Sequence, residues 1–287
     1  MKLIKYSYQD CWNYALALQE KVKIEEIKSD IITLCRATPE KFWSDFANKS
    51  LSASDYSQIC RNLDKYLKEN YPVPYLTNQV YFYGLSFYIK EGVFIPQPDT
   101  EILVEKVLEL ANKYWGKEIK LKVLEIGTGC GNIVIPLAKS KPNWSFTTVE
   151  INSQALAVAK KNSIIHQTKN IKFVHSNLFN NLSQSKKFDI IVSNPPYISS
   201  EEYQGLPSVV KAQPIEALIA ENDGYFFYQK IFQQAREFLA KRFLLVVEVG
   251  YQQAKKVVKL IMKYFPQSHS QVFFDYNGQT RVIVIFS

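Results

Sequence analysis

The stretch Val123-Leu124-Glu125-Ile126-Gly127-Thr128-Gly129-Cys130-Gly131-Asn132 decides the fold class of this 287-residue chain. Its first half is typical of a buried strand, and its three glycines let the backbone turn tightly and approach a ligand before a helix begins. A dinucleotide-binding loop needs the spacing G-x-G-x-x-G, whereas here the third glycine comes one residue early, and no Gly-Lys-Ser/Thr follows as in a P-loop. The loop therefore predicts a nucleoside-like ligand that lacks a pyrophosphate.

Apolar runs and helical segments alternate around this loop, from residue 99 to the end of the chain. Strands are predicted over 121–126, 145–149, 171–174, 188–193, 242–249, 272–274 and 282–286, and helices over 101–114, 133–139, 154–165, 225–239 and 252–265. This alternation is typical of an α/β fold with a parallel, doubly wound sheet. Glu150 ends the second strand, about 20 residues after the loop, where an acid can accept both hydroxyls of a ribose.

The N-terminal quarter of the chain has a helical pattern instead. Apolar residues recur at helical spacing over 20–35 and over 52–67. The prolines of Tyr71-Pro72-Val73-Pro74 are expected to end the second helix, and residues 79–89 alternate like a β-hairpin. We therefore expect three parts, which are a helical domain over 1–74, a linker with a hairpin over 75–98 and an α/β domain over 99–287.

The composition is that of an ordinary globular protein. The chain has 47% hydrophobic and 22% charged residues, which excludes disorder and a coiled coil. No apolar run approaches the roughly 20 residues that span a bilayer, and the first residues lack the apolar segment of a secretory signal. We therefore expect a cytoplasmic protein without a membrane partner. The four cysteines form no CxxC pair and the three histidines are scattered, so no metal site is expected.

The net charge of +8 is compatible with a nucleic-acid partner. However, five of the 35 basic residues are arginine, so bidentate contacts to phosphate or guanine are poorly supplied. Residues 1–75 carry 11 basic and 10 acidic side chains, which leaves this part nearly neutral. A neutral helical domain does not fit a module that reads bases, and no direct DNA binding is expected.

A second motif, Asn194-Pro195-Pro196-Tyr197, follows the predicted strand 188–193. The two prolines stop the strand and stiffen the loop, so the flanking groups keep one geometry. The Asn194 side-chain carbonyl and the Pro195 carbonyl can accept both hydrogens of a planar –NH2 group, which aims the nitrogen lone pair at an electrophilic methyl group. Tyr197 can supply an aromatic wall. Because an amide nitrogen is a poor nucleophile, such a site contributes orientation and electrostatics.

In this order, the two motifs resemble those of the class I S-adenosylmethionine-dependent methyltransferases that act on amino groups. The resemblance implies a Rossmann-like seven-stranded sheet and S-adenosylmethionine as the cofactor. It places Glu125 at the methionine end, Asn177 at the adenine amino group and Leu178 against the adenine ring. The implied cofactor contacts are Glu125, Gly127, Thr128, Gly129, Cys130, Gly131, Glu150, Asn177, Leu178 and Asn194, and the implied catalytic residues are Asn194, Pro195, Pro196 and Tyr197.

Other segments resemble one family within this class, the release factor glutamine methyltransferases. These segments are Pro74-Tyr75-Leu76-Thr77, Phe94-Ile95-Pro96-Gln97-Pro98-Asp99-Thr100-Glu101, Gln213-Pro214-Ile215-Glu216-Ala217-Leu218, Glu248-Val249-Gly250-Tyr251-Gln252 and Arg281. The resemblance covers essentially the whole chain. It implies methylation of the side-chain amide nitrogen (N5) of the glutamine in the Gly-Gly-Gln motif of class 1 peptide-chain release factors. The helical N-terminal domain would then dock this protein partner.

The chain departs from the family pattern at three positions. Gln97 replaces the usual Arg between two prolines, Asn177 replaces Asp and Gln213 replaces Glu. If the first and third positions pair in relatives, we expect an amide–amide pair between Gln97 and Gln213. None of the three lies in the Asn-Pro-Pro-Tyr motif, so retained activity with altered cofactor affinity is expected.

Three alternatives stay open. One is glutamine methylation of a ribosomal protein, which the segment from Pro96 to Glu101 disfavours because that sister group varies it. Another is adenine-N6 methylation of nucleic acid, which would need a base-reading domain and a flipped base. The third is a non-catalytic binding protein, which the intact cofactor loop and the intact Asn-Pro-Pro-Tyr motif disfavour.

Overall fold

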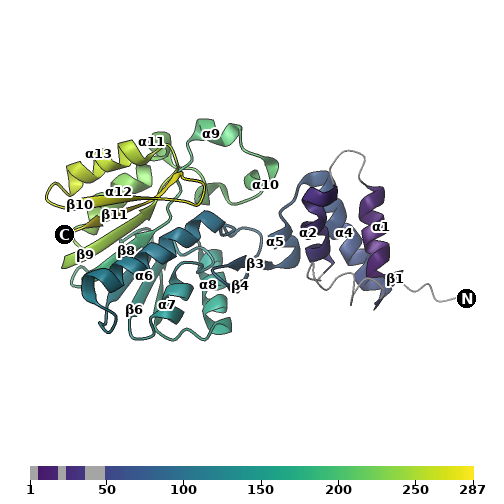
Figure 1. Cartoon of the computed structure of the whole chain (residues 1–287), viewed down its shortest axis with the longest axis horizontal. Helices are drawn as coiled ribbons and strands as arrows, with labels where there is room; N and C mark the ends of the chain where they lie inside the picture. Colours follow the sequence, from purple (N-terminus) through teal and green to yellow (C-terminus); the bar gives the residue numbers. More distant parts are fainter. Residues whose placement is uncertain (1–5, 19–23, 36–48) are drawn as a thin grey trace, which may run out of the picture. The chain divides into compact units, whose positions relative to one another are not determined.

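The computed structural model describes residues 6–18, 24–35 and 49–287 of the chain. The chain divides into two compact units, one made of Met1–Gln79 with Pro207–Ala212 and one made of Val80–Leu206 with Gln213–Ser287 (Figure 1). The first unit is helical, and the second contains a large sheet. No helix within the described ranges is long and apolar enough to cross a membrane.

The helical unit has a hydrophobic core of its own, in which Ile31 and Leu63 are fully buried. Its elements are β1 (Tyr6–Ser7), α1 (Tyr8–Ala17), α2 (Ile24–Leu34), β2 (Ser50–Leu51), α4 (Ala53–Glu69), α5 (Val73–Thr77) and α10 (Ser208–Lys211). Helix α4 begins after Ser52, whose hydroxyl accepts the Asp55 N–H at 3.0 Å. The predicted stop at residues 71–74 is followed at once by α5, because proline is tolerated in the first turn of a helix.

A sheet of seven strands forms the centre of the second unit, in the order β10-β11-β9-β8-β5-β6-β7. The strands are β5 (Lys122–Ile126), β6 (Ser145–Glu150), β7 (Ile171–His175), β8 (Phe188–Ser193), β9 (Leu239–Glu248), β10 (His269–Phe274) and β11 (Thr280–Phe286). The five strands from β9 to β7 are parallel. The predicted α/β class and the seven-stranded sheet are therefore confirmed.

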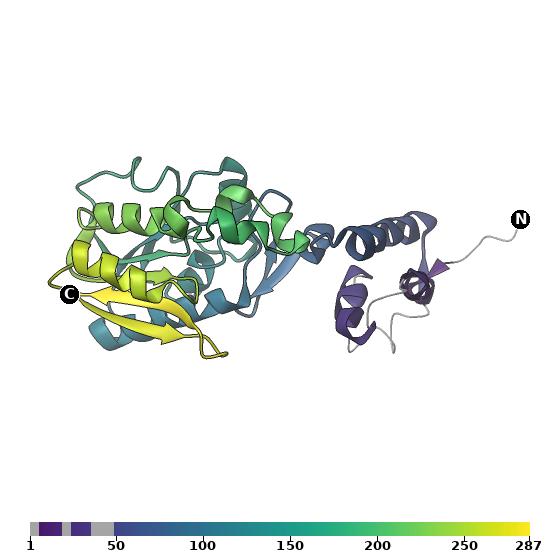
Figure 2. The same ribbon diagram turned by 90° about the horizontal axis from the view of Figure 1, so that it is seen from above.

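The prediction of a parallel sheet is wrong at one edge. Strand β11 runs antiparallel to both β9 and β10, and Figure 2 shows β10 and β11 as the yellow hairpin. The loop between them is a tight turn, in which the Asp275 side chain accepts the N–H groups of Asn277 and Gln279 at 3.0 and 2.9 Å. Two strands joined by so short a turn must be antiparallel.

The helix predicted over 225–239 is shorter than expected. Helix α12 covers Phe226–Ala235, and β9 already begins at Leu239. The reason is a tertiary contact, because the Phe188 N–H donates to the Phe238 carbonyl at 2.7 Å and Phe188 pairs with Leu239. Strand pairing therefore prevails over the helical pattern of these apolar residues.

Helices cover both faces of the sheet (Figures 1 and 2). Helices α6 (Glu101–Trp115), α7 (Val134–Ser140) and α8 (Ser153–Ile165) lie on one face, and α12 and α13 (Ala254–Tyr264) on the other. Tyr228 and Phe232 of α12 are fully buried in the core on that second face. Burial on both faces explains why the central strands are almost continuously apolar. The short elements η2 (Pro98–Thr100), α9 (Ser200–Gln204), η3 (Ile215–Ala217) and α11 (Glu221–Gly224) complete the unit.

The predicted hairpin is present as β3 (Gln79–Phe82) and β4 (Leu85–Tyr88), with Gly84 in the turn at a φ of +68°. The buried side chain of Asn162 in α8 accepts the Tyr88 N–H at 2.8 Å and donates to the Tyr88 carbonyl at 2.9 Å. It also donates to the Cys130 carbonyl at 2.9 Å. One amide therefore connects the hairpin, helix α8 and the glycine loop.

The carboxyl ends of the parallel strands meet at one edge of the sheet. Ile126 of β5 pairs with Ser193 of β8, which pairs in turn with Val247 of β9. Glu150 is the last residue of β6, and Glu248 is the last residue of β9. Ligands of open α/β sheets bind at this edge, where the strand order reverses between β5 and β8.

Candidate active site

The glycine loop has the backbone geometry that its residues predict. Gly127, Gly129 and Gly131 have φ values of +78°, +53° and +89°, in the region that disfavours side chains. A Cβ atom on Gly127 or Gly129 would meet no atom within 4 Å, so both face open space. A Cβ on Gly131 would instead lie 2.7 Å from Cδ1 of Ile135. The third glycine therefore permits close packing against α7, whereas the first two leave room for a ligand.

Glu125 lies behind the loop and fixes its shape. Its carboxyl is buried and accepts the Thr128 hydroxyl at 2.6 Å, the Thr148 hydroxyl at 2.5 Å and the Val134 N–H at 3.2 Å. Burial raises the pKa of Glu125 to about 8, although these three hydrogen bonds act in the opposite direction. The carboxyl therefore braces the loop at the start of α7.

Glu150 connects the loop to the next strand. One of its oxygens accepts the Gly129 N–H at 2.9 Å, and the other accepts the Asn152 N–H at 2.9 Å. Asn152 in turn caps α8 by accepting the N–H groups of Gln154 and Ala155. Each carboxylate oxygen has a second lone pair, so Glu150 keeps the capacity to accept from a ligand.

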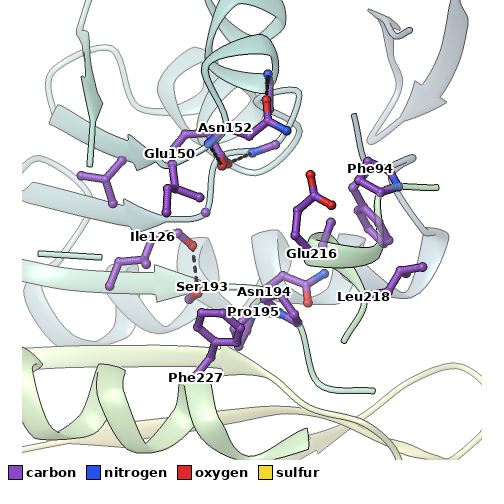
Figure 3. A pocket seen from close by; sticks show the side chains of 18 of the residues that line it. Phe94, Ile126, Glu150, Asn152, Ser193, Asn194, Pro195, Glu216, Leu218 and Phe227 are labelled. Atoms are coloured by element: carbon purple, nitrogen blue, oxygen red, sulfur yellow. Dashed lines mark hydrogen bonds between the residues drawn. The ribbon is translucent and has the colours of Figure 1, made fainter. Parts of the chain in front are cut away.

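A cavity of about 370 Å³ opens at this edge of the sheet. In Figure 3, Glu150 and Asn152 lie on one side of the cavity, and Asn194, Glu216 and Leu218 lie on the other. The predicted site residues that line it are Gly127, Gly129, Glu150, Asn177, Leu178, Asn194, Pro195, Pro196 and Tyr197. Nine positions from four separate chain segments are therefore brought together.

Four other predicted cofactor residues do not line this cavity, namely Glu125, Thr128, Cys130 and Gly131. The side chains of Glu125, Thr128 and Cys130 are buried. Direct contact between these residues and a cofactor stays a prediction. In the structure, Glu125 and Thr128 help to fix the shape of the loop. Within the ranges that the structure describes, no group of His, Cys, Asp or Glu residues could hold a metal ion.

The Asn-Pro-Pro-Tyr loop is fixed by hydrogen bonds on both sides. The Ser193 hydroxyl donates to the Ile126 carbonyl at 2.8 Å, which joins the ends of β8 and β5. The Asn194 Nδ2 group donates to the Thr100 hydroxyl at 3.1 Å. At the other end, Gln253 Nε2 donates to the Tyr197 carbonyl at 2.8 Å. The loop therefore presents Asn194 from a rigid frame.

Gly224 lies directly against this loop. A Cβ atom at this position would be 2.1 Å from the Tyr197 carbonyl oxygen, and the φ of +86° is unfavourable for any other residue. Burial also raises the pKa of the Tyr197 phenol. The phenol is therefore neutral, and the Tyr197 backbone leaves no space for a side chain at position 224.

A cluster of charged side chains lies next to Asn194 and Thr100. Arg281 of β11 pairs with Asp99 at 2.8 Å and with Asp275 at 3.1 Å. Glu248 is almost completely buried at the end of β9, and burial raises its pKa to about 7. The hydroxyl of Thr100, the amide of Asn194 and the charge of Arg281 act in the opposite direction on this pKa.

Several cavity residues were not among the predicted site residues. They are mainly apolar or aromatic, and they include Phe94, Phe226, Phe227 and Ile231, together with Asn152 and Glu216. Phe94 and Glu216 belong to segments that resemble the family, so the sequence could have identified these two as site residues. The aromatic residues of α12 gave no signal, because a phenylalanine on an amphipathic helix is ordinarily a core residue.

The expected amide–amide pair between Gln97 and Gln213 is not present. Gln213 is buried and accepts the Ile95 N–H at 2.9 Å, whereas Gln97 donates to the Ile95 carbonyl at 2.9 Å. The two side chains therefore fix the backbone just before η2. Gln213 binds the N–H of Ile95, and Gln97 binds its carbonyl.

Comparison with known proteins gives consistent matches. A family described as "Methyltransferase small domain" matches residues 86–211. The chain is 33% identical over 272 residues to the release factor glutamine methyltransferase of Streptococcus pneumoniae, which covers 93% of this chain and 94% of that one. It is 38% identical over 261 residues to the protein of that name in Fusobacterium nucleatum, covering 91% and 71%. A methyltransferase structure from Pyrococcus furiosus shares the fold, with a TM-score of 0.52 and 18% identity over 82% of this chain and 98% of that one.

Proposed function

This chain belongs to the release factor glutamine methyltransferase family, and we propose that it methylates the side-chain amide nitrogen of the Gly-Gly-Gln glutamine in class 1 peptide-chain release factors. The methyl donor would be S-adenosylmethionine. One observation carries the proposal. The Asn194 amide is anchored by its nitrogen to buried Thr100, and it lines the cavity on the side opposite Glu150 (Figure 3).

The residues around the cavity fit an adenosyl cofactor. Gly127 and Gly129 have open space where a side chain would stand, and Glu150 has free lone pairs that suit the ribose hydroxyls. Asn177 and Leu178 also line the cavity, and they offer an amide oxygen and an apolar surface to an adenine ring. When bound, the cofactor supplies an electrophilic methyl group on a sulfonium.

The acceptor side of the cavity suits a planar –NH2 group. Within the described part of the chain, Asn194 Nδ2 is engaged by Thr100, while its Oδ1 is free to accept. The Pro195 carbonyl supplies a second acceptor, and a Pro residue offers no competing N–H. Two acceptors orient both hydrogens of a glutamine amide and polarise its nitrogen. The site therefore supplies orientation and electrostatic stabilisation to a weak nucleophile.

We also propose that the helical unit docks the release factor. The unit has a hydrophobic core of its own, and the near neutrality of residues 1–75 suits a protein partner better than a nucleic acid. Hydrogen exchange on the full chain tests this point. Protection by bound release factor should appear on the helical unit, and protection confined to residues 213–287 would contradict it.

The decisive experiment offers the purified chain tritiated S-adenosylmethionine with one acceptor at a time. The acceptors are a release factor, the same factor with Gly-Gly-Gln changed to Gly-Gly-Ala, ribosomal proteins and unmethylated DNA. We expect label on the intact release factor alone. Label on DNA or on a ribosomal protein, with none on the release factor, would overturn the proposal.

Two variants control this assay. Asn194→Ala removes an acceptor of the substrate amide and should abolish most of the labelling. Asn112→Ala changes an asparagine on α6 that accepts the Lys141 ammonium and does not line the cavity. The second variant should label the release factor as the unchanged protein does, which shows that the first loss is specific to the site.

A further inference from the structure

The Asn194 side chain can be used in two orientations that differ by half a turn of the amide. With Oδ1 toward the substrate, the side chain accepts a hydrogen from the glutamine –NH2 group. With Nδ2 toward the substrate, it offers a second donor to a group that is itself a donor. The amide alone has almost the same shape in both orientations, so another group must select between them.

Thr100 touches the amide from the protein side. Its hydroxyl is completely buried at the end of η2 and accepts the Asn194 Nδ2–H at 3.1 Å. The Thr100 hydroxyl can also donate. It would then bind Oδ1 of Asn194 equally well, with Nδ2 turned toward the substrate. Thr100 therefore selects the productive orientation only if its single proton is directed elsewhere.

Glu248 is a buried acceptor close to this hydroxyl. Its carboxyl is almost completely buried at the end of β9, and Thr100 and Asn194 lie close enough to lower its pKa. Its Oε2 atom has no hydrogen-bond partner in the part of the chain that the structure describes. A buried carboxylate oxygen without a partner is a strong acceptor for a nearby hydroxyl proton. If it takes the Thr100 proton, the hydroxyl keeps its lone pairs for Asn194.

The position of this pair is fixed by a charged clamp. Arg281 on β11 bonds to Asp99, the neighbour of Thr100, at 2.8 Å, and to Asp275 at 3.1 Å. The clamp ties η2 to the edge of the sheet where Glu248 ends β9, and Glu248 pairs with Val282 of β11. The clamp thus holds Thr100 near the strand end that carries Glu248.

We propose that Glu248, acting through the Thr100 hydroxyl, is a positioning residue that determines which end of the Asn194 amide faces the substrate. In this proposal, the observed hydrogen bond from Asn194 Nδ2–H to Thr100 Oγ1 is completed by a second one, from the Thr100 hydroxyl to the Glu248 carboxylate. This inference rests on the proposed function, because it concerns how the same amide receives its acceptor. It adds two residues that touch neither cofactor nor substrate.

Protonation of Glu248 would favour the opposite orientation of the Asn194 amide. A protonated carboxyl can donate to Thr100, whose own proton then turns to Asn194 and favours the flipped amide. Burial brings the pKa of Glu248 to about 7, so this change falls within an accessible range. The charged and titratable groups that face Glu248 are Asp99 on η2, Arg281 on β11, Tyr197 after β8 and Tyr228 on α12. The inactive orientation is therefore expected to dominate at acid pH.

The first test separates orientation from binding. Thr100→Val keeps the shape but removes the hydroxyl, and we expect kcat for release factor methylation to fall about 10²-fold. Equilibrium dialysis should show unchanged binding of S-adenosylmethionine. Thr100→Ser restores the hydroxyl and should recover kcat to within several-fold. A Thr100→Val enzyme with full kcat, or a Thr100→Ser enzyme as poor as Thr100→Val, would overturn the proposal.

The second test uses pH. The kcat of the unchanged enzyme should rise about tenfold between about pH 6 and about pH 8. Glu248→Gln keeps an acceptor oxygen but cannot be protonated in this range, so its kcat should not follow this rise. The same pH limb in the Glu248→Gln enzyme would contradict a role for the carboxyl.

A third measurement does not depend on catalysis. In protein labelled with ¹⁵N-asparagine, the Asn194 side-chain amide signal, assigned with Asn194→Asp, should move with pH near 7 and stay fixed in Glu248→Gln. If the signal of the unchanged protein does not move, the proposal fails whatever the enzyme methylates. Absence of methylation by the unchanged protein, together with a moving signal, would instead refute the proposed function alone.

Discussion

Glu125 offers a direct test of how burial and hydrogen bonding compete at the glycine loop. Its carboxyl is buried at the end of β5 and accepts the side chains of Thr128 and Thr148 and the N–H of Val134. Burial has the larger effect and raises the pKa from 4.5 to about 8. The test is therefore to raise the pH and to compare the free energy of unfolding of the unchanged protein with that of Glu125→Gln. Glutamine keeps the shape of the side chain but cannot ionise.

The magnitude follows from linkage. Because the pKa in the folded state is above that in the unfolded state, the folded state binds this proton more tightly. The resulting stability is fully present below pH 4.5 and is lost as the pH rises through about 8. The gap between the two pKa values corresponds to about 5 kcal/mol in total, and about 3 kcal/mol of it falls between roughly pH 5.5 and roughly pH 8.5.

Urea denaturation at these two pH values measures the effect. The free energy of unfolding of the unchanged protein should fall by about 3 kcal/mol more than that of Glu125→Gln, since glutamine does not ionise. Glu237→Gln is the matched control, because Glu237 is exposed and lies outside the glycine loop. Other titrating groups, Glu248 among them, are common to all three proteins and cancel in the comparison.

One result would refute the reasoning. If the difference in unfolding free energy between the unchanged protein and Glu125→Gln is the same at both pH values, then Glu125 is ionised in the folded state at both, as it is in the unfolded state. Hydrogen bonds from the loop would then outweigh burial, and the carboxyl would be an ionised anchor of the loop.

Three further predictions concern the site and the core. Gly224→Ala places a Cβ where the Tyr197 carbonyl stands, so the loop must shift, and kcat in the release factor assay should fall about 10²-fold; an unchanged kcat would contradict the rigid frame described above. Glu150→Ala removes the acceptor of the Gly129 N–H and the expected ribose contact, and calorimetry should show S-adenosylmethionine binding at least about tenfold more weakly. An unaltered Kd would mean that the ribose lies elsewhere. Phe232→Ala empties a fully buried site and should lower the free energy of unfolding in urea by about 3–5 kcal/mol, whereas a loss below about 1 kcal/mol would show that α12 repacks.

Much of the fold is predictable because its signals are local. Strand β8 covers Phe188–Ser193, as the apolar run predicts, and helix α6 begins at Glu101, as expected. The glycine loop and the Asn-Pro-Pro-Tyr motif each follow a strand, so their meeting at one edge follows from the parallel order of those strands. Local patterns thus determined the class of fold and the two motifs of the site.

Other features depend on contacts between distant parts of the chain. The end of α12 is set by pairing of Phe188 with Leu239, and the direction of β11 by the turn at Asp275. Gln97 and Gln213 both bond to Ile95, a geometry that no spacing in the sequence reveals. Propensity and periodicity describe neighbours along the chain, and they contain no information on which strand edge receives a given residue.

The sequence by itself determined the glycine loop, Glu150 at the end of the second strand of the α/β domain, and the proline-stiffened loop with Asn194. Each is a short pattern with its own chemistry. Only the tertiary structure decided that Thr100, 94 positions earlier in the chain, would accept the Asn194 amide, and that buried Glu248 would lie beside both. The reason is physical. A side-chain amide has no intrinsic preference for either orientation, so the acceptors packed around it, which the register of β8, β9 and β11 brings together, must select the end that it presents.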